Sequence, residues 1–379
     1  MMSDFASKDL TNLNDLARLK NLESYDYALD SSLIASKPTM PKSAAKLLVY
    51  DRQSDSITHT TFARIWDFIP QECLIVLNDT KVIRARIYGK KLSIAQANGT
   101  KGAKIELLYH KYLGESSGKS SADSWHRFLV QIRGKVKVGD CIIFSDGIVA
   151  KVRKLRENGL REVEFYRNDE ILDERAILDF LQTHGHIPLP PYIKRSDNKA
   201  DSGDYQSIFA KNIGSIAAPT ASLHFSDSDK SEIAKRPHCF VSLHIGAGTF
   251  FAVESADITA HKMHSESFFV AQDTANIIRN ANEILCVGTS ATRCVEYLAQ
   301  NFQISSKNDD FCGECDMFIN PLNPPRKTSH ILTNFHLPKS TLIMLVAGFI
   351  GLPKTLEIYQ IAQDLRYRFY SYGDAMLIL

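Results

Sequence analysis

The sequence predicts an α/β protein into which a module of short antiparallel strands is inserted. Three observations support this fold class. In the second half of the chain, buried strands lead into Gly-containing turns and helices, which is typical of an α/β sheet. Between residues 76 and 154 the pattern changes to short strands separated by turn residues, which indicates a small barrel or sandwich. The length of 379 residues also exceeds what one hydrophobic core usually supports.

Composition narrows the class of protein. A hydrophobic fraction of 44% with 23% charged residues is that of a globular protein. The net charge is only +2, from 45 basic and 43 acidic residues, which argues against a partner attracted by the overall charge of the protein. Phosphate groups of a ligand could still be bound by a local cluster of basic residues. The seven cysteines form an odd set, and the apolar stretch at 342–352 is too short to cross a bilayer. We therefore expect a cytoplasmic protein without a membrane segment.

The N-terminal residues 1–24 read as an added segment before the α/β domain. Leu10, Leu13, Leu16 and Leu19 recur at a helical spacing and predict a short helix there. The α/β domain is expected to be discontinuous, over residues 25–75 and 155–379, with the inserted domain at residues 76–154.

The strands expected before and within the insertion are short and bounded by turn residues. Apolar runs at residues 46–51 and 73–77 predict two strands of the α/β sheet. The inserted module is expected to contain strands near 84–89, 104–109, 128–132 and 141–144. Gly and Asp-Gly or Asn-Gly turns separate them, as at Asp146-Gly147.

After residue 169 the pattern is mixed. Residues 170–183 predict an amphipathic helix, and residues 240–245 and 283–287 predict strands. Each of these strands leads into a Gly-containing turn, and the second turn opens a helix over 292–301. Because ligands of α/β sheets gather at the carboxyl ends of the strands, both turns are candidate binding segments.

The turn at Gly288 and Thr289, followed by Arg293, begins a helix. A helix N-terminus offers free N–H groups and the positive end of a dipole, which suit an anion or a hydroxyl-rich ligand. The Gly-Lys-Ser/Thr ending of a phosphate-binding loop is missing. The competing interpretation is an ordinary connection capped by Thr289 or Ser290.

A second candidate segment follows the first of these strands: His244, Gly246, Gly248 and Thr249. Paired glycines allow a backbone to approach a ligand closely. The rest of the dinucleotide-binding fingerprint is absent, so Gly-x-Gly alone is a weak signal. The competing interpretation of His244 is structural, because a histidine on a strand is more often a hydrogen-bonded residue of the core than a ligand-binding one.

Two groups raise the question of a metal. His261 and His264 stand near Glu266, but the His-Glu-x-x-His spacing of zinc enzymes is not met. Acid–base or hydrogen-bonding roles are therefore favoured for this group. Cys312 and Cys315 form a solitary Cys-x-x-Cys, for which two ordinary thiols in a surface loop are the favoured interpretation. We expect no metal.

Basic residues interspersed with apolar ones mark the start of the inserted module. Lys81, Arg84, Arg86, Lys90 and Lys91 lie along one predicted strand. With Lys42, Lys194 and Arg195 they could contact a nucleic-acid backbone. A charged run on a strand is more often its solvated face, and that alternative is favoured on these residues alone.

Read together and in order, these segments resemble the S-adenosylmethionine:tRNA ribosyltransferase-isomerase family of queuosine biosynthesis. The resemblance runs from Tyr25 to Leu377. The matching segments are residues 25–27, 77–86, 188–195, 214–225, 243–250, 333–342, 368–374 and 373–377. Ser222 departs from the family pattern, which commonly has Gly there, and Cys312 and Cys315 do not belong to it.

The resemblance implies a fold and an activity. The fold is an α/β main domain interrupted by an inserted antiparallel β-barrel. The activity transfers and isomerises the ribosyl group of S-adenosylmethionine onto 7-aminomethyl-7-deazaguanine in tRNA, giving epoxyqueuosine and releasing adenine and methionine. S-adenosylmethionine is then a co-substrate, tRNA is the partner, no cofactor is permanently bound, and the chain is expected to be a monomer.

The chemistry that the resemblance implies needs a base near the ribosyl C5′ and a proton donor for adenine, and histidine suits both near neutral pH. The catalytic candidates are His264 and His224 first, then Glu266, His244 and His336. The residues expected to contact S-adenosylmethionine are Gly246, Gly248, Thr249, Gly288, Thr289 and Arg293. Those expected to contact tRNA are Arg84, Arg86, Lys194 and Arg195. A methyltransferase using the same co-substrate and a non-catalytic RNA-binding protein are the competing functions.

Overall fold

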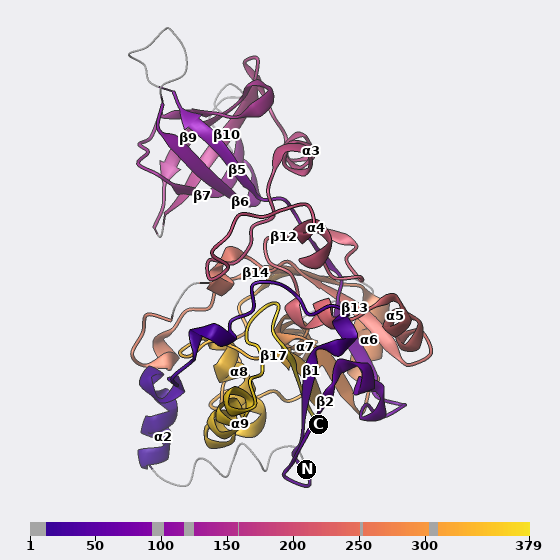
Figure 1. Ribbon diagram of the computed structural model, residues 1–379. Helices are drawn as coiled ribbons and strands as arrows, with labels where there is room; N and C mark the ends of the chain where they lie inside the picture. Colours follow the sequence, from indigo (N-terminus) through magenta and orange to yellow (C-terminus); the bar gives the residue numbers. More distant parts are fainter. Residues whose placement is uncertain (1–12, 93–101, 117–124, 158, 251–252, 303–309) are drawn as a thin grey trace. The chain divides into compact units, whose positions relative to one another are not determined.

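The computed structural model describes residues 13–92, 102–116, 125–157, 159–250, 253–302 and 310–379 (Figure 1). The chain forms two compact units, each described here by itself. The first unit comprises Met1–Lys81, Pro191–Lys194 and Ser202–Leu379, and the second comprises Val82–Pro190 and Arg195–Asp201.

The first unit is built on a nine-stranded mixed sheet. Its central strands β13, β3, β15 and β17 are parallel to one another, and antiparallel pairs extend both edges. In spatial order the strands are β16 (Phe311–Cys315), β14 (Glu266–Val270), β13 (His238–Leu243), β3 (Leu74–Asn78), β15 (Ile284–Val287), β17 (His330–Asn334), β18 (Ala375–Ile378), β1 (Lys46–Asp51) and β2 (Ser56–Thr61).

Both faces of this sheet are buried, which explains the continuous apolar runs in its central strands. In β3, Leu74 and Val76 belong to the core on one face, while Ile75 and Leu77 belong to the core on the other. Successive side chains of a strand point to opposite faces, so a five-residue strand supplies two cores at once.

Helices cover the sheet. The first core is shared with α6 (Gln272–Asn280), α7 (Thr289–Asn301), α8 (Thr341–Ile350) and α9 (Leu352–Asp364). The second is shared with the short turn η4 (Phe62–Asp67), with η7 (Thr220–His224) and with α5 (Asp227–Ile233). Smaller elements of this unit are α2 (Leu13–Lys20), α4 (Asp201–Asp204, at a unit boundary), η1 (Leu22–Tyr25), η2 (Ser31–Leu33), η3 (Lys42–Ala44), η8 (Ala247–Phe250), η9 (Ile258–Ala260) and the pair β4 (Thr80–Val82) with β12 (Asn212–Ser215).

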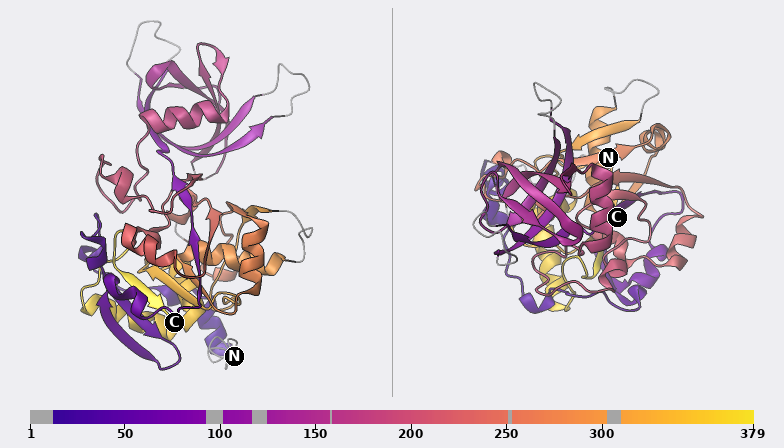
Figure 2. Two further views of the ribbon diagram at one scale, coloured as in Figure 1. Left: turned by 90° about the vertical axis from the view of Figure 1, so that its right-hand side faces the viewer. Right: turned by 90° about the horizontal axis from the view of Figure 1, so that it is seen from above.

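The second unit is a closed antiparallel β-barrel. Its six strands pair in the circuit β10-β7-β6-β5-β8-β9, and β9 pairs back onto β10 (Figure 2). Closure leaves no free sheet edge within this circuit. The strands are β5 (Arg86–Lys91), β6 (Lys104–Glu115), β7 (His126–Arg133), β8 (Cys141–Ile143), β9 (Ile148–Leu155) and β10 (Leu160–Arg167), followed by β11 (Glu170–Ile171) and α3 (Glu174–His184).

The predicted fold class, an α/β domain interrupted by an antiparallel β-barrel, is confirmed. The boundary drawn at residue 154 differs from the structure, in which residues 155–190 belong to the barrel unit. The physical reason is long-range pairing, because β10 closes the barrel against both β7 and β9. The helix expected over 170–183 begins later, at Glu174, because Asp173 caps it through a hydrogen bond from the Ala176 N–H (2.8 Å).

Two further expectations concern the N-terminus and the apolar stretch near the C-terminus. The leucine pattern is helical over α2, whereas Leu10 lies outside the described residues. Within the described part of the chain, no single helix has the length and apolar character to cross a membrane. The helices α8 and α9 satisfy that test only as a pair, and they are bent by 112° relative to each other.

Candidate active site at the carboxyl ends of the central strands

A cavity of the first unit lies where β13, β15 and β17 end. It encloses about 760 Å³, including its open mouth. Several chain segments far apart in the sequence contribute to its wall. The polar, glycine and tyrosine residues that line it include Tyr192, Thr220, Thr249, Glu266, Gly288, Thr289, Ser290, Arg293, Thr333, Asn334, His336, Tyr370 and Ser371.

The N-terminus of α7 forms one side of this cavity. Gly288 adopts φ +92° between β15 and the helix, and its N–H donates to the Leu332 carbonyl of β17 (2.8 Å). A side chain at this φ would be strained, which explains why a glycine ends the strand here. Gly288 occupies the N-cap position and has no side chain with which to cap the helix. The first N–H groups of α7 therefore face the cavity as donors for a ligand.

Asn78 at the end of β3 fixes this helix start to the neighbouring strand. Its Nδ2 donates to Ser290 Oγ and to the Leu243 carbonyl, both at 3.0 Å. Its Oδ1 accepts from the N–H groups of Thr80 (3.1 Å) and Leu243 (3.2 Å). One buried amide thus makes four hydrogen bonds, which is its full capacity, and holds β3, β13 and α7 in register.

A buried ion pair crosses the floor of the cavity. Glu266 and Arg293 are 4% and 7% exposed, and their Oε2 and Nη1 atoms are in direct contact. Glu266 Oε1 also accepts from the Gly246 N–H (2.9 Å) and from Thr249 Oγ1 (3.2 Å). Glu266 therefore holds the Gly-x-Gly turn in place.

Arg293 is anchored on its other side by backbone carbonyls. Its Nε donates to Met317 O (3.0 Å) and its Nη2 to Cys315 O (3.3 Å). Burial alone would lower the pKa of Arg293, but the charge of Glu266 raises it above its ordinary value. A permanently charged guanidinium in a low-dielectric wall is suited to an anionic ligand group.

The predicted histidines fall in different places. His336 lines the cavity, and its Nε2 lies 2.8 Å from Thr333 Oγ1. Burial lowers the pKa of His336 to about 3, so it is neutral at physiological pH. His224 lies behind the wall, stacked on Phe62, with its Nε2 3.2 Å from Asn334 Nδ2. Its pKa is also lowered to about 3, by burial first and by nearby Arg368 second.

The other two histidines stand beside the glycines. His244 Nδ1 lies 2.8 Å from Thr80 Oγ1, and burial lowers its pKa. The exposed His264 packs against Gly248, where a Cβ would lie 2.4 Å from the imidazole Cγ. Thus Gly248 provides the space in which the His264 ring sits.

The predicted tRNA-binding residues differ in their exposure, and two of them form ion pairs within the barrel unit. Arg86 of the barrel unit is largely buried, with its Nε 3.2 Å from Glu106 Oε1 and its Nη2 donating to Leu189 O (3.1 Å). Arg195 forms a bidentate pair with the buried Asp201, at 2.7 Å on both sides. Lys194 is exposed, and Arg84 is half-buried.

The prediction from sequence missed several residues of this site. Asn78 lies within the matching segment 77–86 but is not among the predicted site residues, although a polar residue directly after a buried strand marks the carboxyl edge of a sheet. Tyr192, Thr220 and Tyr370 carry no such signal, because none of them directly follows a strand of the sheet.

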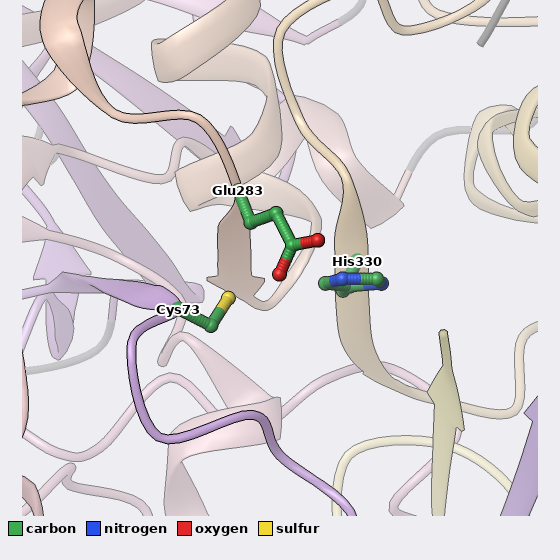
Figure 3. A group of neighbouring side chains, drawn as sticks. All are labelled: Cys73, Glu283 and His330. Carbon is green, nitrogen blue, oxygen red and sulfur yellow. The ribbon is translucent and has the colours of Figure 1, made fainter. Parts of the chain in front are cut away.

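One group of side chains among the described residues has the spacing of metal ligands. Cys73, Glu283 and His330 stand at the amino ends of β3, β15 and β17, with ligand atoms within 4.8 Å of one another (Figure 3). Burial and the Glu283 charge raise the pKa of Cys73 to about 11, which favours the thiol over the metal-binding thiolate. Three ligands are also one short of a structural zinc site, so we assign no metal here.

The remaining Cys-x-x-Cys is ill-placed for chelation. Cys312 and Cys315 lie on β16, not in a surface loop, so residues three apart point to opposite faces. Cys312 is exposed, whereas Cys315 is buried with its Sγ 3.7 Å from Arg293 O. The expectation of a surface loop was wrong, because the segment pairs with β14 along its length.

The fold and this site define an α/β enzyme with an inserted β-barrel. Residues 22–378 match the family described as queuosine biosynthesis protein, and the chain belongs to that family. The resemblance inferred from its segments is confirmed.

Named relatives agree with this membership. The S-adenosylmethionine:tRNA ribosyltransferase-isomerases of Nitratiruptor and Campylobacter jejuni are 51% and 50% identical, over 94% of this chain and 98% of theirs. That of Helicobacter acinonychis is 48% identical over 95% of this chain and 99% of its own. A crystal structure of S-adenosylmethionine tRNA ribosyltransferase from Thermotoga maritima is 28% identical, with 94% of this chain and 100% of that chain covered and a TM-score of 0.49.

Proposed function

We propose that this chain is an S-adenosylmethionine:tRNA ribosyltransferase-isomerase whose active site is the cavity at the ends of β13, β15 and β17. It transfers and isomerises the ribosyl group onto 7-aminomethyl-7-deazaguanine in tRNA, forms epoxyqueuosine, and releases adenine and methionine. The observation that carries this proposal is one cavity that combines an uncapped helix N-terminus, a buried Arg–Glu pair and a neutral histidine.

The binding groups for S-adenosylmethionine follow from this arrangement. The N–H groups at the start of α7, from Thr289 onward, suit the hydroxyls of the ribosyl group or the methionine carboxylate, whereas the Gly288 N–H already donates to Leu332 O. Three of the five N–H groups of Arg293 already have partners among the described residues, which leaves two for that carboxylate. Gly246, Gly248 and Thr249 form the opposite turn, held by Glu266.

The reaction needs a base that removes a C5′ proton, acidified by the adjacent sulfonium. His264 stays the first candidate, because it is exposed beside Gly248 at the edge of the Gly-x-Gly turn. With a pKa of about 3, His336 is a weak base and is better suited to a hydrogen bond in the wall. His224 and His244 orient neighbouring groups, Asn334 and Thr80 respectively.

For tRNA, exposure favours Lys194 over Arg86 and Arg195, which already hold Glu106 and the buried Asp201; Arg84 remains a candidate. A cation that already holds a buried carboxylate contributes little to binding a phosphate without giving up that partner. The chain acts as a cytoplasmic monomer, where tRNA and S-adenosylmethionine are both available.

The decisive experiment incubates the purified chain with S-adenosylmethionine and tRNA that carries the deazaguanine precursor. Mass spectrometry should find free adenine, methionine and the modified nucleoside. A methyltransferase would instead give S-adenosylhomocysteine and no adenine. A non-catalytic RNA-binding protein would leave both substrates intact. Either of these results would overturn the proposal.

A further inference from the structure

Tyr370 has an unusual backbone for a tyrosine. Its φ is +73°, in the left-handed region that bulky side chains rarely adopt. Glycine or asparagine would make the same turn without this strain. A strained residue persists only where its surroundings hold it, and such residues cluster at functional sites.

The surroundings hold Tyr370 from both sides. Its N–H donates to the Phe335 carbonyl (2.9 Å), and its own carbonyl accepts from the Gly373 N–H (2.8 Å). The loop closes through Asp374, which is 1% exposed and accepts from the backbone N–H groups of Arg368 (2.8 Å) and Lys46 (3.0 Å). These bonds fix the backbone, and the fixed backbone delivers the ring to the cavity.

The ring itself is backed by a second tyrosine. The centroids of Tyr192 and Tyr370 lie 4.0 Å apart, and both rings line the cavity. The Tyr192 hydroxyl is fully engaged with Ser371, donating to its Oγ and accepting from its N–H (3.2 Å). Tyr192 is therefore a fixed support for the Tyr370 ring, which also lines the cavity.

The Tyr370 hydroxyl differs from that of Tyr192. It is buried and has no hydrogen-bond partner among the residues that the structure describes. An unpaired buried hydroxyl costs free energy unless a ligand completes it. The face of the ring suits stacking of a flat ligand ring, and the hydroxyl, in the plane of the tyrosine ring, suits an acceptor that lies beside it.

We propose that Tyr370, supported by Tyr192, is the platform on which the adenine of S-adenosylmethionine stacks, while the Tyr370 hydroxyl, which lies in the plane of its ring, donates to another polar group of the same co-substrate. This inference rests on the proposed function, because it assigns that co-substrate to the cavity. Adenine is the part of the co-substrate with an extended π-face. The ribosyl and methionine parts instead suit the polar wall formed by α7 and Arg293.

The experiment measures binding of S-adenosylmethionine without tRNA, by calorimetry. Tyr370→Asn removes the ring but tolerates the left-handed backbone, and Tyr370→Phe keeps the ring without the hydroxyl. Stacking of a base on an aromatic side chain predicts a loss of roughly 5- to 150-fold for Tyr370→Asn. Loss of one neutral hydrogen bond predicts roughly 2- to 12-fold for Tyr370→Phe. Competition by adenosine should weaken in parallel, and competition by methionine should not change.

A measurement on the wild-type chain guards against a variant that fails to fold. Adenine protons that lie over a tyrosine ring shift upfield in the NMR spectrum of bound adenosine. Absence of that shift, or equal affinity of the Asn variant and the wild type for S-adenosylmethionine, would overturn the platform. Unchanged affinity together with a raised KM for tRNA would assign the ring to the deazaguanine base instead. In each case adenine release by the wild type still reports separately on the proposed function.

Discussion

Removing the charge of Glu266 should destabilise the α/β unit strongly. The substitution Glu266→Gln keeps an oxygen for the Gly246 N–H but leaves the Arg293 guanidinium without its counter-charge. Both side chains are less than a tenth exposed, so water cannot replace the lost partner. Breaking a buried pair from one side costs about 3–5 kcal/mol, and we expect the free energy of unfolding to fall by that amount.

The two tryptophans provide a reporter for the α/β unit alone. Trp66 lies in the first unit, with its Nε1 donating to Asp229 Oδ1 (2.9 Å), and Trp125 lies in the barrel unit. In a Trp125→Phe background, urea unfolding followed by fluorescence therefore reports on Trp66. The matched control is Glu23→Gln, which breaks an exposed pair with Lys339 and should leave the midpoint unchanged.

Two results would refute this reasoning. A loss of less than about 1 kcal/mol for Glu266→Gln would mean that the buried pair is not a clamp. The double variant Glu266→Gln, Arg293→Met should recover much of the loss, because the cost arises from the charge left unpaired. If the double variant is no more stable than the single one, the cost has another source.

Four further outcomes are expected. Acidification from pH 7 to 4.5 should destabilise the α/β unit by on the order of 2–3 kcal/mol for each of His224 and His336. In the unfolded chain each histidine takes up a proton below its ordinary pKa of about 6.5, whereas in the folded chain the pKa is about 3, so acid favours the unfolded state. His224→Asn should therefore flatten the pH dependence of the free energy of unfolding. Gly248→Ala should displace the His264 ring and lower the turnover rate. If His264 is the base, His264→Ala should lower the turnover rate by roughly 10²–10⁴-fold, and a turnover rate equal to that of the wild type would contradict this role. Lys194→Ala should weaken tRNA binding and reduce its salt slope by about 0.7–0.9, whereas Arg86→Ala should mainly lower the melting temperature of the barrel. Dialysis against EDTA and Cys73→Ser should both leave activity unchanged, and zinc at one equivalent by elemental analysis would contradict this.

Much of the fold was predictable from local pattern. The strand β1 matches its apolar run at both ends, and β3 and β15 match theirs within one residue, because a buried strand bounded by turn residues is a local signal. The start of α7 was placed three residues late, since its first turn is polar and faces a cavity. The end of the barrel was unpredictable, because β10 is assigned by its pairing with strands from earlier in the chain.

The site was predictable in parts but not as a constellation. The glycine turn at Gly288 and the sequence neighbourhood of Glu266 gave recognisable signals. The pairing of Glu266 with Arg293 was not predictable. Glu266 begins β14 and Arg293 lies on α7, and only the order of the strands in the sheet brings these two elements together. The backbone of Tyr370 was also beyond prediction, since a positive φ at a tyrosine contradicts its own local preference.

The same segments that build the cavity also connect it to the barrel. The chain leaves the first unit after Lys81, directly after Asn78 and Thr80, which hold α7 and His244. It returns at Pro191, directly before Tyr192, which supports Tyr370. Two of the four crossings between the units thus lie next to residues that hold or line the cavity. A substitution in either segment therefore changes the surroundings of the cavity and a connection to the barrel at the same time, as at Tyr192, which lines the cavity one residue after the chain returns.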